Sequence, residues 1–98
     1  MRTDLLQLSD TVTDEPSFIA FLWAMANEWN ESEALEAAKP SSPYGPTVLG
    51  WENRSFGSIM EAAAAWADAS ADGLPLYEKP TNTWQRAAQI LAMGKHYE

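Results

Sequence analysis

Apolar residues recur at helical spacing in three stretches of the chain. The first stretch follows Asp14–Glu15–Pro16–Ser17, a sequence typical of a helix start, with a capping side chain, an acid and a proline in the first turn. Its main stripe runs at i, i+3, i+4, i+7 and i+11: Phe18, Phe21, Leu22, Met25 and Trp29. Three further apolar residues widen the stripe: Ile19, Trp23 and Ala26. We therefore expect a helix that is covered on more than one side.

The other two stretches predict two more main helices. Ser55 is a natural N-cap for the second, and Asn82-x-x-Gln85 matches a capping box for the third. One face of the second helix carries Phe56, Ile59, Ala63 and Trp66, and one face of the third carries Trp84, Ala87, Ala88 and Leu91. Because no run of β-branched residues alternates with period two, the pattern predicts an all-α fold, a compact bundle of three main helices.

Shorter segments complete the expected bundle. Leu5, Leu6 and Leu8 suggest a helical turn over the core, and Asn30-x-x-Glu33 predicts that a separate helical segment starts there and ends at Ala38. Residues 40–50 contain three prolines and two glycines and are the clearest loop. We expect a single domain over residues 1–98, with its core in residues 14–98.

The composition removes several kinds of chemistry. The 98 residues include no Cys, which excludes thiolate catalysis, Cys-ligated zinc and iron–sulfur clusters. His96 is the only histidine, and neither a phosphate-binding glycine loop nor an EF-hand pattern occurs. We therefore expect no enzymatic activity, no catalytic residue, no cofactor and no metal site.

The net charge of −8 is placed unevenly, because residues 1–50 hold eight acids and two bases. Such a surface disfavours nucleic acid and anionic membranes. The acidity has two interpretations: it keeps a small protein soluble, or it forms a face that meets a basic protein partner. The longest apolar run, residues 18–26, is too short to span a bilayer, and the first residues lack the apolar stretch of a secretory signal. We expect a soluble, cytoplasmic protein.

Four glutamates in the first half have two competing interpretations. As partner-binding residues, they would steer a cationic protein by charge; as structural residues, they would form a solvated helix face or favour a helix N-terminus. These residues are Glu28, Glu31, Glu33 and Glu36.

Trp51–Glu52–Asn53 lies just before the Ser55 cap and also has two interpretations. An exposed Trp51 would be an interface anchor, whereas a buried one would pin the loop against the bundle. We favour a structural hinge, with Trp51 buried and Asn53 hydrogen-bonded to the backbone near residues 55–56.

Taken together, GWENRS at residues 50–55, Trp66-x-Asp68, Trp84, Leu91 and the terminal Tyr97–Glu98 resemble a family of small acidic bacterial helical domains of unknown function. The similarity covers residues 14–98 and implies a structural motif of Trp51, Glu52, Asn53, Ser55, Trp66, Trp84 and Tyr97. The chain departs from the family in its Pro-rich loop. It also departs at Gly57–Ser58, which replaces acidic residues and so removes a good capping box.

The resemblance implies an immunity protein of a bacterial toxin system. The first functional hypothesis is therefore a non-catalytic interaction domain, an immunity or antitoxin-like inhibitor that covers a basic surface of a cognate toxin. The alternatives are a stand-alone accessory or scaffold domain, and a small-molecule binder with an aromatic pocket.

Overall fold

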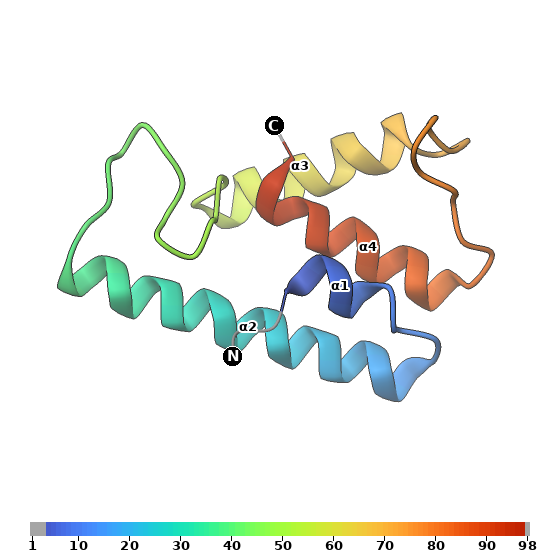
Figure 1. Cartoon of the computed structure of the whole chain (residues 1–98), viewed down its shortest axis with the longest axis horizontal. Coiled ribbons are helices and arrows are strands. Elements are labelled where there is room, and N and C mark those ends of the chain that lie inside the picture. Colours follow the sequence, from blue (N-terminus) through green and yellow to red (C-terminus); the bar gives the residue numbers. More distant parts are fainter. Residues whose placement is uncertain (1–3, 98) are drawn as a thin grey trace.

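The computed structural model describes residues 4–97, which form four helices joined by loops (Figure 1). In chain order these are α1 (Leu5–Ser9), α2 (Glu15–Ala38), α3 (Phe56–Ala69) and α4 (Thr83–His96). Within residues 4–97 there is no strand, and the only bridge pairs Leu74 with Tyr77 across a tight turn. The predicted all-α bundle is confirmed.

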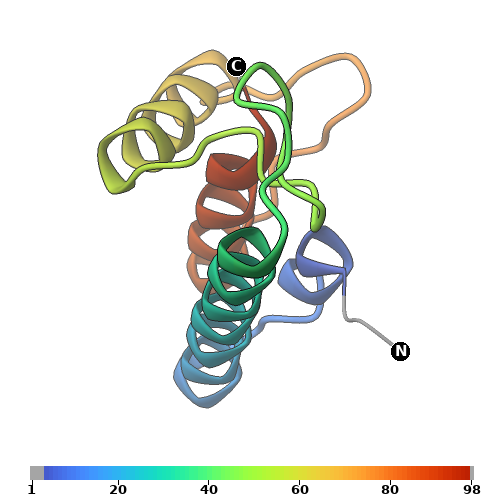
Figure 2. The ribbon, with the colours of Figure 1, turned by 90° about the vertical axis from the view of Figure 1, so that its left-hand side faces the viewer.

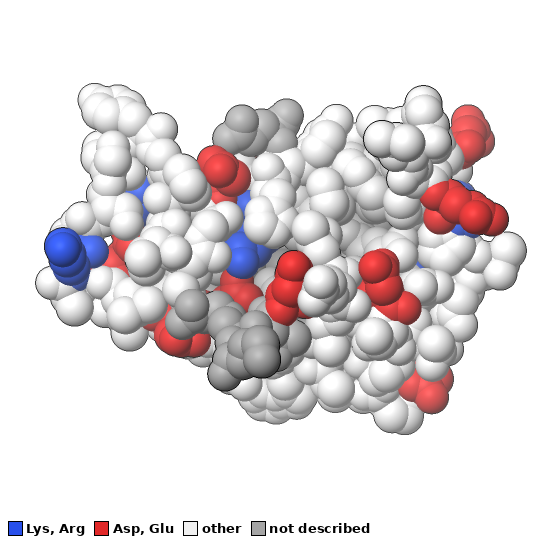
Figure 3. Space-filling view, in the orientation of Figure 1, with Lys and Arg blue, Asp and Glu red and all other residues white. Residues whose placement is uncertain are grey.

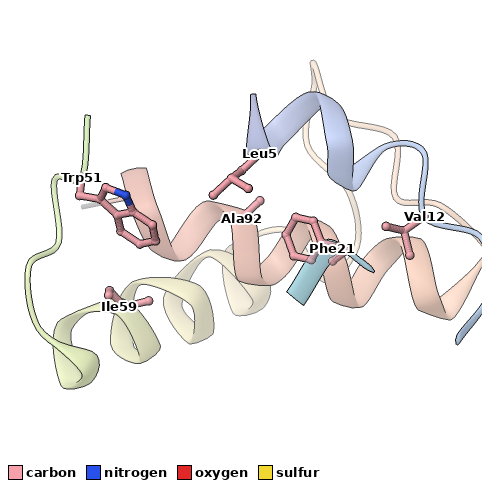
Figure 4. Packing of buried hydrophobic residues seen from close by; sticks show 7 residues of the cluster. Leu5, Val12, Phe21, Trp51, Ile59 and Ala92 are labelled. Carbon is pink, nitrogen blue, oxygen red and sulfur yellow. The ribbon is translucent and has the colours of Figure 1, made fainter. Parts of the chain in front are cut away.

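Helix α4 holds the fold together. It packs against each of the other three helices, whereas no Cα atom of α3 comes within 8 Å of one in α2 (Figure 2). Ala88 and Ala92 of α4 are completely buried, and their small side chains let the neighbouring helices approach closely. The buried apolar cluster around them draws on every helix and two loops (Figure 4): Leu5, Val12, Phe21, Trp51, Ile59, Ala88 and Ala92.

Serine closes the capping boxes at the starts of α2 and α3. The Asp14 side chain accepts from the Ser17 N–H at 3.0 Å, and the Ser17 hydroxyl accepts from the Asp14 N–H at 3.1 Å. Ser55 and Ser58 repeat this exchange at the start of α3. The prediction that Gly57–Ser58 removes a capping box is therefore wrong, because a serine hydroxyl can take the place of the usual carboxylate.

Helix α2 is continuous, and the predicted new start at Asn30 is wrong. No proline or glycine interrupts residues 17–38, so the backbone hydrogen bonds run through Asn30 without a cap. The helix ends where Lys39 donates its N–H to the Leu35 carbonyl and Pro40 prevents further turns.

Trp66 is buried, as predicted, and it anchors the connection between α3 and α4. The Tyr77 ring meets the Trp66 ring edge-on at 5.0 Å, and the Arg86 guanidinium lies 5.0 Å over Trp66. Arg86 also donates to the Ser70 hydroxyl and the Ala67 carbonyl at the end of α3. Trp84, at the start of α4, is a rim residue that packs on Phe18.

Candidate functional site

Trp51–Glu52–Asn53 caps the C-terminal end of α4. The N–H groups of Glu52 and Asn53 both donate to the Lys95 carbonyl, and the Asn53 side-chain amide donates to the Gly94 and Tyr97 carbonyls at 2.9 Å each. These bonds satisfy carbonyls that the end of a helix leaves without partners. The tripeptide thus ties the loop to α4, as a hinge should, but the predicted Asn53 contact near residues 55–56 is wrong.

Beneath this cap lies a buried ion pair. Lys95 is 7% exposed and Glu28 of α2 is 6% exposed, and the Lys95 ammonium donates to the Glu28 carboxylate. The same ammonium lies 5.5 Å from the centre of the Trp51 ring. Two buried charges are tolerated only when they are paired this closely. We call the group formed by Glu28, Trp51, Asn53 and Lys95 the α4 junction.

His96 follows the junction and is partly buried. Burial lowers the pKa of its imidazole, and the positive charge of Lys95 lowers it further, whereas Asp4 and Glu28 act in the opposite direction. The shift favours the neutral form of the ring.

The four glutamates predicted to bind a partner do not form one face. Glu28 is inside the α4 junction, so a partner-binding role for it does not fit this structure. Glu36 accepts from the Ser41 N–H at 2.9 Å and pairs with Arg54 at 3.1 Å. The hydrogen bond from the Ser41 backbone, more than any other contact, lowers the Glu36 pKa. Only Glu31 and Glu33 are exposed.

The four glutamates are dispersed because successive residues of an α-helix are rotated by 100°. Positions 28, 31, 33 and 36 therefore point toward different sides of α2. On the face that carries α1, acidic side chains are likewise separated by uncharged surface (Figure 3). On this face the acidic residues therefore do not gather into one patch (Figure 3).

An apolar groove is lined by residues of α2, α3 and α4 and by Trp51 of the loop before α3. In the ribbon, α1 and α3 lie on different sides of α4 (Figure 2). The α2 wall of the groove consists of Leu22, Met25, Ala26 and Trp29, which recur at i, i+3, i+4 and i+7. The cavity volume is about 380 Å³. We call this feature the apolar groove.

The opposite wall and the floor come from α3, α4 and the capping loop. Phe56, Ile59 and Met60 form the α3 wall, Leu91 forms the floor, and Trp51 closes the end next to the α4 junction. Inside, the Trp29 ring meets the Trp51 ring edge-on at 5.0 Å. The groove and the junction therefore share Trp51.

The groove leaves large apolar side chains in contact with solvent. Phe56 is 78% exposed and Leu22 is 41% exposed, although the helical spacing predicted both as core. Trp23, next to Leu22 on α2, is 67% exposed, so α2 is not covered on the side predicted from its widened stripe. Periodicity finds apolar stripes, but it does not say which of them another element covers.

The lining of the groove is apolar throughout. The only nitrogen atoms among the lining side chains are the indole nitrogens of Trp29 and Trp51; Trp51 Nε1 is buried without a partner. Among residues 4–97, no three histidine or acidic residues come together as metal ligands would. Nor does any helix in that range have the length and apolarity needed to cross a membrane.

Comparison of the chain with known protein families, with curated proteins and with solved structures found no match.

Proposed function

We propose that this protein is a non-catalytic protein-interaction domain and that the apolar groove is its binding face. The observation that carries the proposal is the exposure of Leu22 and Phe56 on facing walls of the groove. Single exposed apolar residues are common on protein surfaces, but a contiguous group of them marks an interaction site.

The residue types support a protein partner over a small molecule. Trp, Phe and Met are enriched where proteins meet, and the groove presents Trp29, Phe56 and Met60 together. A small-molecule site needs several polar groups that converge on the ligand to orient it, and the lining side chains offer only the indole N–H groups of Trp29 and Trp51, of which the Trp51 nitrogen is buried.

The more specific form of the proposal is an immunity or antitoxin-like inhibitor of a basic toxin. Two observations support it: the net charge of −8, and the resemblance carried by Trp51–Glu52–Asn53 and the later aromatic positions. A strongly acidic inhibitor associates quickly with a basic partner because long-range attraction raises the association rate. An accessory or scaffold domain would use the same groove without a toxin partner, and the product of the adjacent gene distinguishes the two.

The experiment compares three tagged proteins as baits for the product of the adjacent gene and for extracts of the native host. These are the wild type, Leu22→Ser/Phe56→Ser in the groove, and the control Tyr44→Ser/Leu76→Ser. Tyr44 and Leu76 are almost fully exposed on loops outside the groove, so the control removes similar apolar area elsewhere.

We expect the wild type and the control to retain the same partner and the groove variant to lose it. Circular dichroism should show that all three proteins are folded, with a melting midpoint a few degrees lower for the groove variant because Leu22 is only 41% exposed and loses packing as Ser. Retention of the partner by the groove variant would refute the groove as the binding face.

A further inference from the structure

The walls of the apolar groove restrict the backbone of whatever binds there. Both walls and the floor are helices, whose backbone N–H and C=O groups are already bonded within each helix. An extended strand laid in the groove would find no backbone groups to pair with, whereas a helix brings its own hydrogen bonds. The occupant that fits is therefore helical.

The dimensions agree with a helix. On α2, the lining residues from Leu22 to Trp29 cover about 10.5 Å at 1.5 Å per residue, or two turns. Both α2 and α3 pack on α4 without approaching each other, which leaves a position for one more helix across Leu91. Two turns of an amphipathic helix present apolar side chains at i, i+3 or i+4, and i+7, which matches this length.

Charged residues at the two ends of the α2 wall indicate which charge the partner carries. Glu15 lies seven residues before Leu22 and Glu33 lies eleven after it, so both continue the same helical stripe. Both are exposed, and they are about 27 Å apart at 1.5 Å per residue. Two nearby cations are already engaged, since Arg54 pairs with Glu36 and Lys95 with Glu28.

A second copy of the chain would bring the same acids to this surface. Two copies that met through their grooves would oppose Glu15 and Glu33 to like charges, on top of the repulsion between molecules of net charge −8. A partner helix with basic flanks would instead place its apolar residues in the groove and its basic residues beside Glu15 and Glu33.

We propose that the apolar groove binds an amphipathic helix of a partner protein, with an apolar face of about two turns and Lys or Arg on its flanks. This inference rests on the proposed function and adds the chemical class of the partner segment.

The probes are three synthetic peptides of about 18 residues, long enough as helices to reach both Glu15 and Glu33. The first has Leu at i, i+3, i+4 and i+7 and Lys elsewhere. The second keeps the Leu positions and replaces Lys by Glu. The third scrambles the first, so that its charge is the same but it has no apolar face. Fluorescence anisotropy of dye-labelled peptides measures affinity for the full-length protein.

We expect the patterned Lys peptide to bind at least about tenfold more tightly than the scrambled one, and the Glu peptide not to bind. Leu22→Ser/Phe56→Ser should remove this tenfold preference. Phe56→Ser alone should reduce it, and because Phe56 is 78% exposed this single substitution leaves the packing of the fold almost unchanged. Tyr44→Ser/Leu76→Ser should keep it. Equal binding of patterned and scrambled peptides would overturn the proposal, because charge alone would then explain the affinity.

A matched pair of charge variants tests the acid positions. Glu15→Gln/Glu33→Gln and Glu61→Gln/Glu78→Gln change the net charge equally, but Glu61 and Glu78 are exposed acids that do not continue the stripe of Leu22. We expect the first pair to weaken binding of the patterned Lys peptide about threefold per carboxylate, and the second to weaken it less. Equal effects would refute a role for Glu15 and Glu33.

Two further outcomes separate this inference from the proposed function. Sedimentation equilibrium of the wild type alone should show a monomer. If it shows a dimer, and Leu22→Ser/Phe56→Ser dissociates that dimer, the occupant of the groove is a second copy of the chain. That result would overturn the proposal of a partner helix with basic flanks. If the groove variant loses its native partner while the peptides show no preference, the proposed function stands and the helical inference fails. If the peptides discriminate but the native partner is retained by the groove variant, the proposed function fails instead.

Discussion

The ring of Trp51 separates two regions of opposite character, the α4 junction on one side and the apolar groove on the other. In the junction, Lys95 pairs with Glu28, and Asn53 bonds two carbonyls at the end of α4. In the groove, by contrast, α2 and α3 stay apart and leave Leu22 and Phe56 exposed. Buried charges require close partners. Apolar side chains can stay exposed to water, and the free energy that this exposure costs is regained when another surface covers them.

The same contrast appears along α3. At the closest approach of α3 to α4, Ala63 of α3 faces Gly94 of α4: a Cβ added to Gly94 would lie 2.8 Å from the Ile59 carbonyl oxygen and 3.4 Å from the Ala63 Cβ. Toward the groove, α3 presents the bulky Phe56 and Met60. Small residues bring two helices into contact, whereas Phe56 and Met60 leave apolar surface on the side of the groove, the face that we propose for binding.

The largest expected difference is between two tryptophans. Trp51→Ala should lower the free energy of unfolding by about 3–5 kcal/mol, because the ring is 1% exposed and packs against both Lys95 and Trp29. Trp23→Ala, on the exposed side of α2, should change it by less than about 0.5 kcal/mol. Urea unfolding followed by circular dichroism measures both. Similar losses of unfolding free energy for the two variants would mean that Trp51 is no better packed than the exposed Trp23.

The next effect concerns the ion pair. Lys95→Met should cost about 3 kcal/mol, within the range for a broken buried pair, because it leaves the Glu28 carboxylate buried without its partner. Glu28→Leu/Lys95→Met removes both charges and should recover most of that loss. The double variant is the control, and a double-mutant cycle from urea unfolding gives the coupling. Additive losses would show that the two charges do not depend on each other.

The smallest effect compares two glycines. Gly94→Ala should destabilise the protein by about 1–3 kcal/mol, because the new methyl group would push α3 away from α4. Gly57→Ala, beside Phe56 at the start of α3, meets nothing within 4 Å and should stabilise by up to about 1 kcal/mol through helix propensity. Thermal melting should shift in opposite directions. A shift in the same direction would mean that the α3–α4 contact is looser than this structure shows.

Local signals predicted the helices well. Asp14, Ser55 and Asn82 all cap helices as expected, and Pro40 follows the end of α2. These features depend on a few neighbouring residues, which a sequence displays directly. The capping-box pattern at Asn30 predicted a false helix start because the same residues also fit the interior of a helix. The neighbouring Ser32 makes a long-range contact, since its hydroxyl hydrogen-bonds the Thr47 hydroxyl.

Much less of the candidate site could be predicted. The hinge interpretation placed Trp51 in the interior, yet the partners of Asn53 lie more than forty positions away at the end of α4. Glu28 looked like the other acids of its helix, and only its contact with Lys95 sets it apart. Leu22 and Phe56 match the core pattern and are nevertheless exposed.

The sequence alone therefore determined the helical class, the caps, the loop at residues 40–50 and the net charge, because each depends on composition or on residues within one or two turns. The tertiary structure alone decided which apolar stripes are covered and which acids are paired. Those outcomes depend on how α2 and α3 pack on α4, and such long-range contacts leave no fixed spacing in the chain. The apolar groove exists because α4 separates two helices that both carry apolar residues on their facing sides.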